Sequence, residues 1–152
     1  MTYLLIIFII ALALAPLAQV LPSKYQRRIA RMREFAALQG MFVEFRTVPE
    51  SPMVRRTESG YQRGKIIYYG LRVPARSCEV EQPLAWVHGQ DGWNSLPRRA
   101  EVPPVLNGLP TGIIAVGIDQ GSCGVFWQEA GDEADIERIY RVLCELQDHF
   151  KN

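Results

Sequence analysis

Residues 112–129, GIIAVGIDQGSCGVFWQE, decide the fold, because they read as two strands joined by a tight turn. Segments 112–119 and 122–129 are rich in β-branched and aromatic residues. Between them, Gln120-Gly121 supplies a glycine where a two-residue hairpin loop needs positive φ. This loop predicts one apolar face of a sheet, the expected core of the domain. The pairs that should face each other there are Ile118 with Cys123, Val116 with Val125 and Ile114 with Trp127.

The opposite face of this hairpin carries two glycines. Gly117 should lie opposite Gly124, beside Ala115 and Phe126. Two opposed glycines leave a flat spot where another backbone can approach closely. We expect a helix to pack there, and a ligand is the alternative.

Downstream of the hairpin, residues 133–150 read as an amphipathic helix. Asp132 is a good N-cap, and Glu133 and Asp135 put negative charge at the positive end of the helix dipole. One apolar stripe should close the core over the sheet: Ile136, Ile139, Tyr140, Leu143, Leu146 and Phe150.

Upstream, further short segments read as strands. Residues 41–48 alternate in polarity, which directs Met41, Val43 and Phe45 inward, and residues 65–73 are β-branched and aromatic, with Gly70 as a predicted bulge. Residues 74–111 contain six prolines. There we expect strands at 84–88 and 93–96 and an irregular connection over 97–111. The fold class is therefore α+β, an antiparallel sheet of about five strands packed by two helices.

The N-terminal stretch of residues 3–21, YLLIIFIIALALAPLAQVL, is apolar throughout. Its nineteen residues carry no charge, and twelve are Leu, Ile, Phe or Val. As a helix it would be roughly 28 Å long, close to the hydrocarbon thickness of a bilayer. We expect a transmembrane helix bounded by Tyr3 and Leu21.

A basic segment follows this stretch and predicts its orientation. Five basic residues precede the first acid, Glu34: Lys24, Arg27, Arg28, Arg31 and Arg33. Because basic residues flanking a span are retained on the cytoplasmic side, we expect the N-terminus outside and residues 22–152 in the cytoplasm. A cleaved export signal is the alternative, although the segment lacks a basic n-region and Pro16 would follow the Ala13-x-Ala15 cleavage motif.

Residues 23–39 should form an amphipathic helix that begins at Ser23 and stops at Gly40. Its apolar stripe is Tyr25, Ile29, Met32 and Ala36. Residues 24–72 carry eleven Lys or Arg against four acids. The basic residues 24–33 are candidate contacts for anionic lipid headgroups, and a solvated basic face is the alternative.

The cysteines Cys78, Cys123 and Cys144 form no C-x-x-C pair. An odd number suits a reducing cytoplasm, and the alternative is an exported domain with a Cys78–Cys123 bridge. His88 and Asp91, with one of these cysteines, could make a nucleophilic site, but an ordinary turn is the favoured reading.

Other chemistries leave no pattern in the sequence. The histidines share no metal-ligand spacing with the cysteines, and the sequence has no phosphate-binding glycine loop, G-x-S-x-G or H-E-x-x-H. The interleaved aromatic and basic residues of a nucleic-acid reader are also missing. We therefore expect no catalytic residue, metal, cofactor or nucleic-acid partner.

Residues 16–46 include LPSKYQRRIARMREFAALQGMFVEF. This segment, with its basic LPSK-x-QR start, resembles a group of uncharacterised single-pass bacterial inner-membrane proteins. In outline the chain is also similar to the small accessory subunit of the bacterial Sec translocase, although the glycine-rich strand segment of that subunit is missing. Neither likeness assigns a role to any residue.

Three parts follow: an anchor over residues 1–22, a basic juxtamembrane helix over 23–40 and a cytoplasmic α+β domain over 41–152. We expect a membrane-anchored binding or accessory module with a membrane-protein partner. A membrane-bound enzyme using His88, Asp91 and a cysteine is the alternative.

Overall fold

The computed structural model describes residues 2–19, 23–49, 66–73, 83–96, 100–119 and 121–150. The chain divides into two compact units, Met1–Ala30 and Arg31–Asn152. Some features predicted from the sequence lie outside the described residues: Leu21, Pro22, most of the connection between the first two strands, Cys78 and Gln120.

In the first unit, the predicted N-terminal helix is present as α1 (Thr2–Gln19). Large apolar side chains along α1 are exposed, from Tyr3 to Ile10 and at Leu12. Among the residues that the structure describes, no helix is both long and apolar enough to cross a membrane. The spanning role of residues 3–21 therefore stays a prediction.

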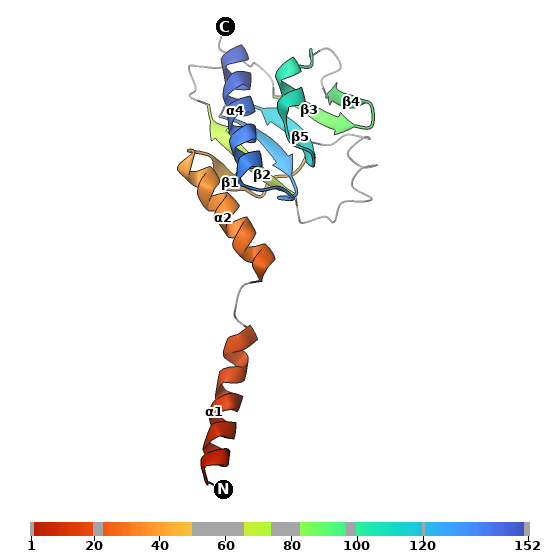
Figure 1. Ribbon diagram of the computed structural model, residues 1–152. Helices are drawn as coiled ribbons and strands as arrows, with labels where there is room; N and C mark the ends of the chain where they lie inside the picture. The colour runs from red at the N-terminus through yellow and green to blue at the C-terminus, as the bar shows by residue number, and fades with distance from the viewer. Residues whose placement is uncertain are drawn as a thin grey trace. The chain divides into compact units, whose positions relative to one another are not determined.

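The second unit is built on one antiparallel sheet (Figure 1). Its described strands number six, against the five or so predicted, and they lie in the order β1-β2-β6-β5-β3-β4. The α+β class is confirmed. The strands are β1 (Phe42–Glu44), β2 (Ile67–Arg72), β3 (Leu84–Gly89), β4 (Gly92–Ser95), β5 (Ile113–Ile118) and β6 (Ser122–Trp127).

Three helical elements accompany the sheet: α2 (Lys24–Leu38), the short 3-10 helix η1 (Pro104–Gly108) and α4 (Glu133–His149). In α2, the Gln26 amide donates to Ser23 Oγ at 3.2 Å, which confirms the predicted N-cap, and Gly40 follows the helix with φ of 79°. In α4, Asp132 caps the helix by accepting from the amides of Ala134 and Asp135.

The main core lies between the sheet and the helices. Met32 and Ala36 of α2 are buried there, together with most of the predicted α4 stripe, namely Ile136, Ile139, Leu143 and Leu146. They pack with the inward residues of the central hairpin. Figure 1 shows α4 crossing this face of the sheet.

The register of the central hairpin is confirmed over most of its length. Ile118 pairs with Cys123 and Val116 with Val125, as predicted. Ile114, however, does not face Trp127. The register shifts between Ile113 and Ala115, so Ile113 takes that place. The extra residue is typical of a β-bulge, and the regular two-residue period of the sequence gives no sign of it.

On the opposite face, the prediction that a helix packs over the paired glycines is wrong for the described residues. Gly117 does pair with Gly124, but the ring of Tyr68 lies against Gly124, 2.5 Å from where a Cβ would stand. Gly70 is not a bulge either, because its pairing is regular on both sides. A Cβ there would stand 2.5 Å from Tyr68 and 2.8 Å from Phe42. Both glycines make room for aromatic rings.

The first strand is shorter than predicted. It ends at Glu44, and Phe45 is 78% exposed, so its predicted inward orientation is wrong. Met41 is buried and Val43 packs against the core, as predicted. After the strand, Arg46 turns back to donate to Ser122 Oγ at 2.8 Å and lies over the Tyr68 ring at 4.3 Å. These contacts draw the chain away from the straight path of a longer strand.

Candidate functional site

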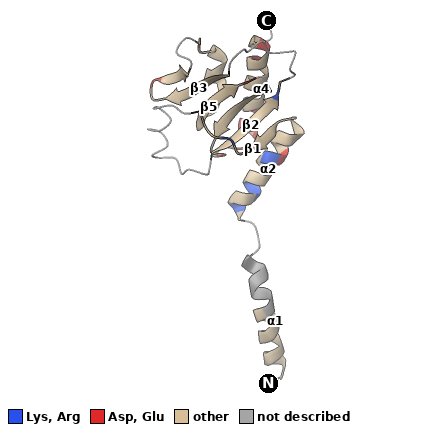
Figure 2. Cartoon of the chain, turned by 180° about the vertical axis from the view of Figure 1, so that it is seen from behind, with Lys and Arg blue, Asp and Glu red and all other residues tan. Residues whose placement is uncertain are grey.

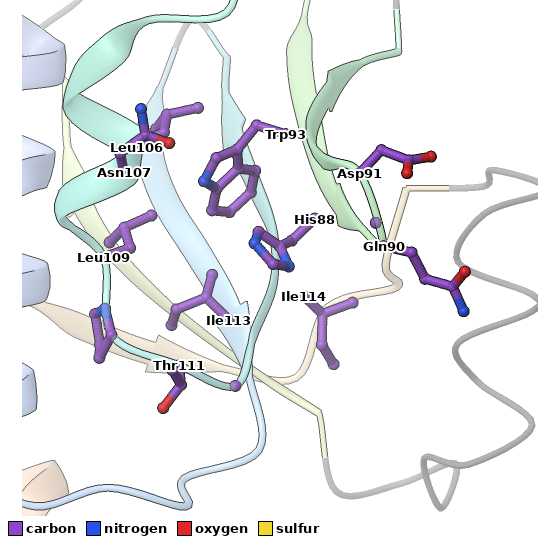
Figure 3. A pocket seen from close by; sticks show the side chains of 13 residues that line it. His88, Gln90, Asp91, Trp93, Leu106, Asn107, Leu109, Thr111, Ile113 and Ile114 are labelled. Carbon is purple, nitrogen blue, oxygen red and sulfur yellow. The ribbon is translucent and has the colours of Figure 1, made fainter.

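A pocket of about 660 Å³ opens beside the β3–β4 hairpin. Three stretches of chain line it: the end of β3 with the hairpin turn and Trp93, the Leu106-Asn107 step of η1, and residues 109–114 leading into β5. Figure 3 shows the labelled side chains gathered between η1 and the hairpin. The size falls within the range of small-molecule binding sites.

The sheet register places two aromatic side chains in this pocket. His88 pairs with Trp93 across the β3–β4 hairpin, so both side chains point to the same face of the sheet. Because side chains alternate along β3, this is also the face of Trp86, which belongs to the main core. The two rings meet edge to face, with centroids 5.0 Å apart.

Apolar residues form the inner wall of the pocket. Leu106 and Ile113 are 1% and 5% exposed and belong to the main core. Leu109, partly buried, packs against them. In Figure 3, Ile113 lies below the His88 ring, and Leu109 stands across from both aromatic side chains. The wall is thus apolar, flanked by aromatic rings.

Polar side chains also line the pocket. They are His88, Gln90, Asn107 and Thr111, with Asp91 as the one carboxylate among the described lining residues. The lining contains no described Lys or Arg. Gly92, at φ of 103°, completes the tight turn that carries Asp91 at the hairpin tip. In Figure 3 the side chains of Gln90 and Asp91 point away from the two rings.

The structure brings together only part of the nucleophilic site considered from the sequence. His88 and Asp91 line the same pocket, but Cys123 and Cys144 do not. Cys123 is buried in the core on β6, and Cys144 lies on α4. A hydrogen bond between Cys144 and Tyr140 raises the pKa of Tyr140. Cys78 lies outside the described residues. The pocket therefore has no cysteine nucleophile from the described part of the chain.

No group of three or more His, Cys, Asp or Glu within the described residues could hold a metal ion. The pocket offers one carboxylate and one imidazole, fewer than a tetrahedral site needs.

The predicted lipid-contacting residues all lie on α2, whose basic side chains Figure 2 draws in blue. Lys24, Arg27, Arg28 and Arg31 are exposed. The Arg28 guanidinium lies 5.4 Å from the centre of the Tyr25 ring. These four residues leave their charges available to solvent or headgroups.

Arg33 has a different environment, because it binds a buried carboxylate. Its Nε and Nη2 donate to Glu129 Oε1 and Oε2 at 2.7 and 2.8 Å. Glu129 is 2% exposed, has a φ of 55° and also accepts from the Tyr69 hydroxyl at 2.6 Å. This hydrogen bonding raises the pKa of Arg33, and burial raises that of Tyr69. Arg33 thus attaches α2 to the sheet, and we leave it out of the proposed lipid surface.

A second polar cluster surrounds Ser122, which is buried at the start of β6. Its hydroxyl lies 3.1 Å from Tyr68 Oη and 3.2 Å from Asp119 Oδ1, and Arg46 donates to it. Asp119 also accepts from the amides of Gly121 and Ser122, which fixes the hairpin turn. Each side chain of the cluster is hydrogen-bonded to another group of the protein. We therefore assign the cluster a structural role.

The sequence indicated the hairpin side of the pocket, with His88 and Asp91, but not the η1 side. Leu106, Asn107 and Thr111 fall in 97–111, which read as irregular. A usable signal was Pro103-Pro104, because proline is favoured in the first turn of a helix, and η1 begins there. Comparisons of the chain with models of protein families, with curated proteins and with solved structures find no match.

Proposed function

We propose that this protein is a single-pass, membrane-anchored module whose cytoplasmic domain binds a ligand in the pocket beside His88 and Trp93. The anchor is residues 3–21, the membrane is the bacterial inner membrane, and the N-terminus faces outward. The single observation that carries the binding role is the pocket of about 660 Å³ with its aromatic and apolar walls.

The composition of residues 3–21 supports the anchor. Its twelve Leu, Ile, Phe and Val residues favour insertion by about 5 kcal/mol in sum on the insertion scale. The exposed apolar side chains of α1, from Tyr3 to Ile10, are what a lipid-facing helix presents. The four exposed basic residues of α2 support the cytoplasmic placement of the domain and contact with anionic headgroups.

Attachment to a membrane gives such a module a physical advantage. Confinement raises the effective concentration of the domain toward any partner in the same membrane, without any new contact. A membrane-protein partner therefore fits this arrangement better than a freely diffusing one. We propose no role for nucleic acid.

The anchor is tested by lysine substitution in the apolar segment. A lysine near the bilayer centre costs about 2.5–3.5 kcal/mol, so Ile9→Lys together with Leu12→Lys should cancel the insertion energy. We expect the unaltered chain to remain in the pellet after alkaline carbonate extraction and the double variant to be released. The matched control is Glu137→Lys with Glu145→Lys, which adds two lysines on exposed positions of α4 and should stay in the pellet.

Release of the unaltered chain would contradict the anchor. Intact-mass measurement of the membrane-bound protein should also retain residues 1–21. Their loss would instead support the exported alternative with a cleaved signal.

A membrane-bound enzyme is the second candidate, because His88 and Asp91 line one pocket. An imidazole at the wall of a pocket can act as a general base. The test is His88→Ala, since His88 is exposed and its loss should leave the fold intact. Loss of a cellular phenotype with unchanged denaturant stability, and without loss of ligand binding at Trp93, would favour the enzyme over the binding module.

A further inference from the structure

We propose that the pocket beside His88 and Trp93 selects an uncharged, flat ring compound whose edge carries a hydrogen-bond donor next to an acceptor, as in an aromatic carboxamide. This rests on the proposed binding function and names the class of its ligand. Three properties of the described lining residues lead to it: the shape of the apolar walls, the lack of paired charge and the chemistry of Asn107.

The walls favour a flat apolar body. Trp93 and His88 stand edge to face at 5.0 Å, and Leu106 and Ile113 provide a buried aliphatic surface beside them. A ring can pack in the offset or edge-to-face arrangements that aromatic side chains prefer, which stabilise binding beyond area burial alone. Figure 3 shows Leu109 on the η1 side facing these rings.

The charge of the lining favours a neutral ligand. An anion would find no Lys or Arg among the described lining residues. A cation would find only Asp91, which is exposed at the hairpin tip and points away from the rings in Figure 3. Moving a charged group next to Leu106 and Ile113 without a partner would carry a large desolvation penalty. Neutral polar groups avoid that cost.

Asn107 supplies the polar complement. Its side-chain amide has both an acceptor oxygen and a donor nitrogen, so it can pair with a carboxamide edge through two hydrogen bonds. It projects from η1 on the side of the pocket opposite the hairpin (Figure 3). The His88 imidazole and the Thr111 hydroxyl are further polar partners along the same lining.

Three probes of similar size test the charge selection: benzamide, benzoate and benzylamine. The full chain is labelled with 5-fluorotryptophan and kept in detergent micelles. The ¹⁹F signal of Trp93 is followed while each probe is added. The chain has three tryptophans, so Trp93→Phe assigns this signal, and the buried Trp86 and Trp127 report on the fold. We expect benzamide to shift the Trp93 signal with a dissociation constant at least fivefold lower than those of benzoate and benzylamine.

Two variants test the role of Asn107. Asn107→Ala should weaken benzamide binding at least threefold, because it removes both hydrogen bonds. Gln90→Ala is the matched control: it also removes a side-chain amide from the lining, but one that points away from the rings, and it should change binding less than twofold. Both residues are exposed, so neither change should disturb the Trp86 and Trp127 signals.

Several results would overturn the proposal. These are no shift of Trp93 with any probe, benzoate or benzylamine binding as tightly as benzamide, or equal losses in the two variants. Tighter binding of N-acetyl-phenylalanine amide than of benzamide would overturn the assignment of a free small molecule as the ligand. It would favour instead a peptide that presents the same ring and amide. Tight binding of benzoate or benzylamine would overturn the ligand class and leave the proposed binding role of the pocket standing, whereas no shift with any probe would count against both. The carbonate extraction of the anchor is independent of all these results.

Discussion

Arg33 of α2 forms a two-pronged ion pair with Glu129, which follows β6, at 2.7 and 2.8 Å. The residues lie 96 positions apart in the chain, and Tyr69 of β2 shares the same carboxylate. The contact fixes the C-terminal half of the basic helix to the sheet.

Removing Arg33 should destabilise the domain, because it leaves a carboxylate buried without its cation. Complete loss of one partner of a buried pair costs about 3–5 kcal/mol. The Arg33 side chain is 39% exposed, so water screens part of the interaction, and we expect Arg33→Ala to lower the free energy of unfolding by about 2 kcal/mol. Urea titration of the full chain, monitored by tryptophan fluorescence, measures this change in the free energy of unfolding.

The exposed neighbour Arg31 is the control for this change. Arg31→Ala should shift the free energy of unfolding by less than about 0.5 kcal/mol. In a double-mutant cycle, Arg33→Ala with Glu129→Ala should cost less than the sum of the two single changes. Simple additivity would show that the two side chains do not stabilise each other.

The glycine pair of the central hairpin should respond unequally to alanine. A Cβ at Gly124 would meet the fixed backbone oxygen of Tyr69 and stand 2.5 Å from the Tyr68 ring. A Cβ at its partner Gly117 would have no neighbour nearer than 3.8 Å. We expect Gly124→Ala to cost about 2–3 kcal/mol by overpacking, and Gly117→Ala to change stability by less than about 0.5 kcal/mol. Thermal unfolding of the two variants, side by side, checks this; equal losses would contradict the close contact of Tyr68 with Gly124.

Much of the second unit was predictable because its signals are local. The capped helix after Asp132 and the strand register at the turn end of the hairpin depend on residues close in sequence, and both are as predicted. The residues of the hairpin that point into the core follow from the two-residue period of a strand as far as Ala115, where the register shifts.

The wrong predictions fall where residues distant in sequence determine the local structure. Phe45 leaves the sheet because Arg46 engages Ser122, which lies 76 positions away. The bulge at Ile114 and the ring over Gly124 depend on neighbouring strands in the same way. Half of the pocket was missed because its η1 wall lies in a proline-containing stretch with no clear period.

The two tyrosines of β2 should ionise late in alkali. Burial raises the pKa of Tyr68 to about 12, and burial with the hydrogen bond to Glu129 raises that of Tyr69 as well. The unfolded chain loses these protons near pH 10, whereas the folded chain keeps them. Stability is therefore unaffected below pH 10 and falls above it, by about 1.4 kcal/mol per pH unit for each tyrosine.

Absorbance at 295 nm follows this ionisation directly. Tyr68→Phe should remove part of the late step. A single step near pH 10 that accounts for every tyrosine of the folded protein would contradict the burial of Tyr68 and Tyr69.

The side of the membrane that holds the domain is measured most directly by a pair of reporters fused after Asn152. One reporter is a green fluorescent protein that matures only in the cytoplasm, and the other is an alkaline phosphatase active only in the periplasm. We expect bright fluorescence and no phosphatase activity, because Lys24, Arg27, Arg28 and Arg31 resist translocation. Phosphatase activity without fluorescence would contradict the anchored cytoplasmic module.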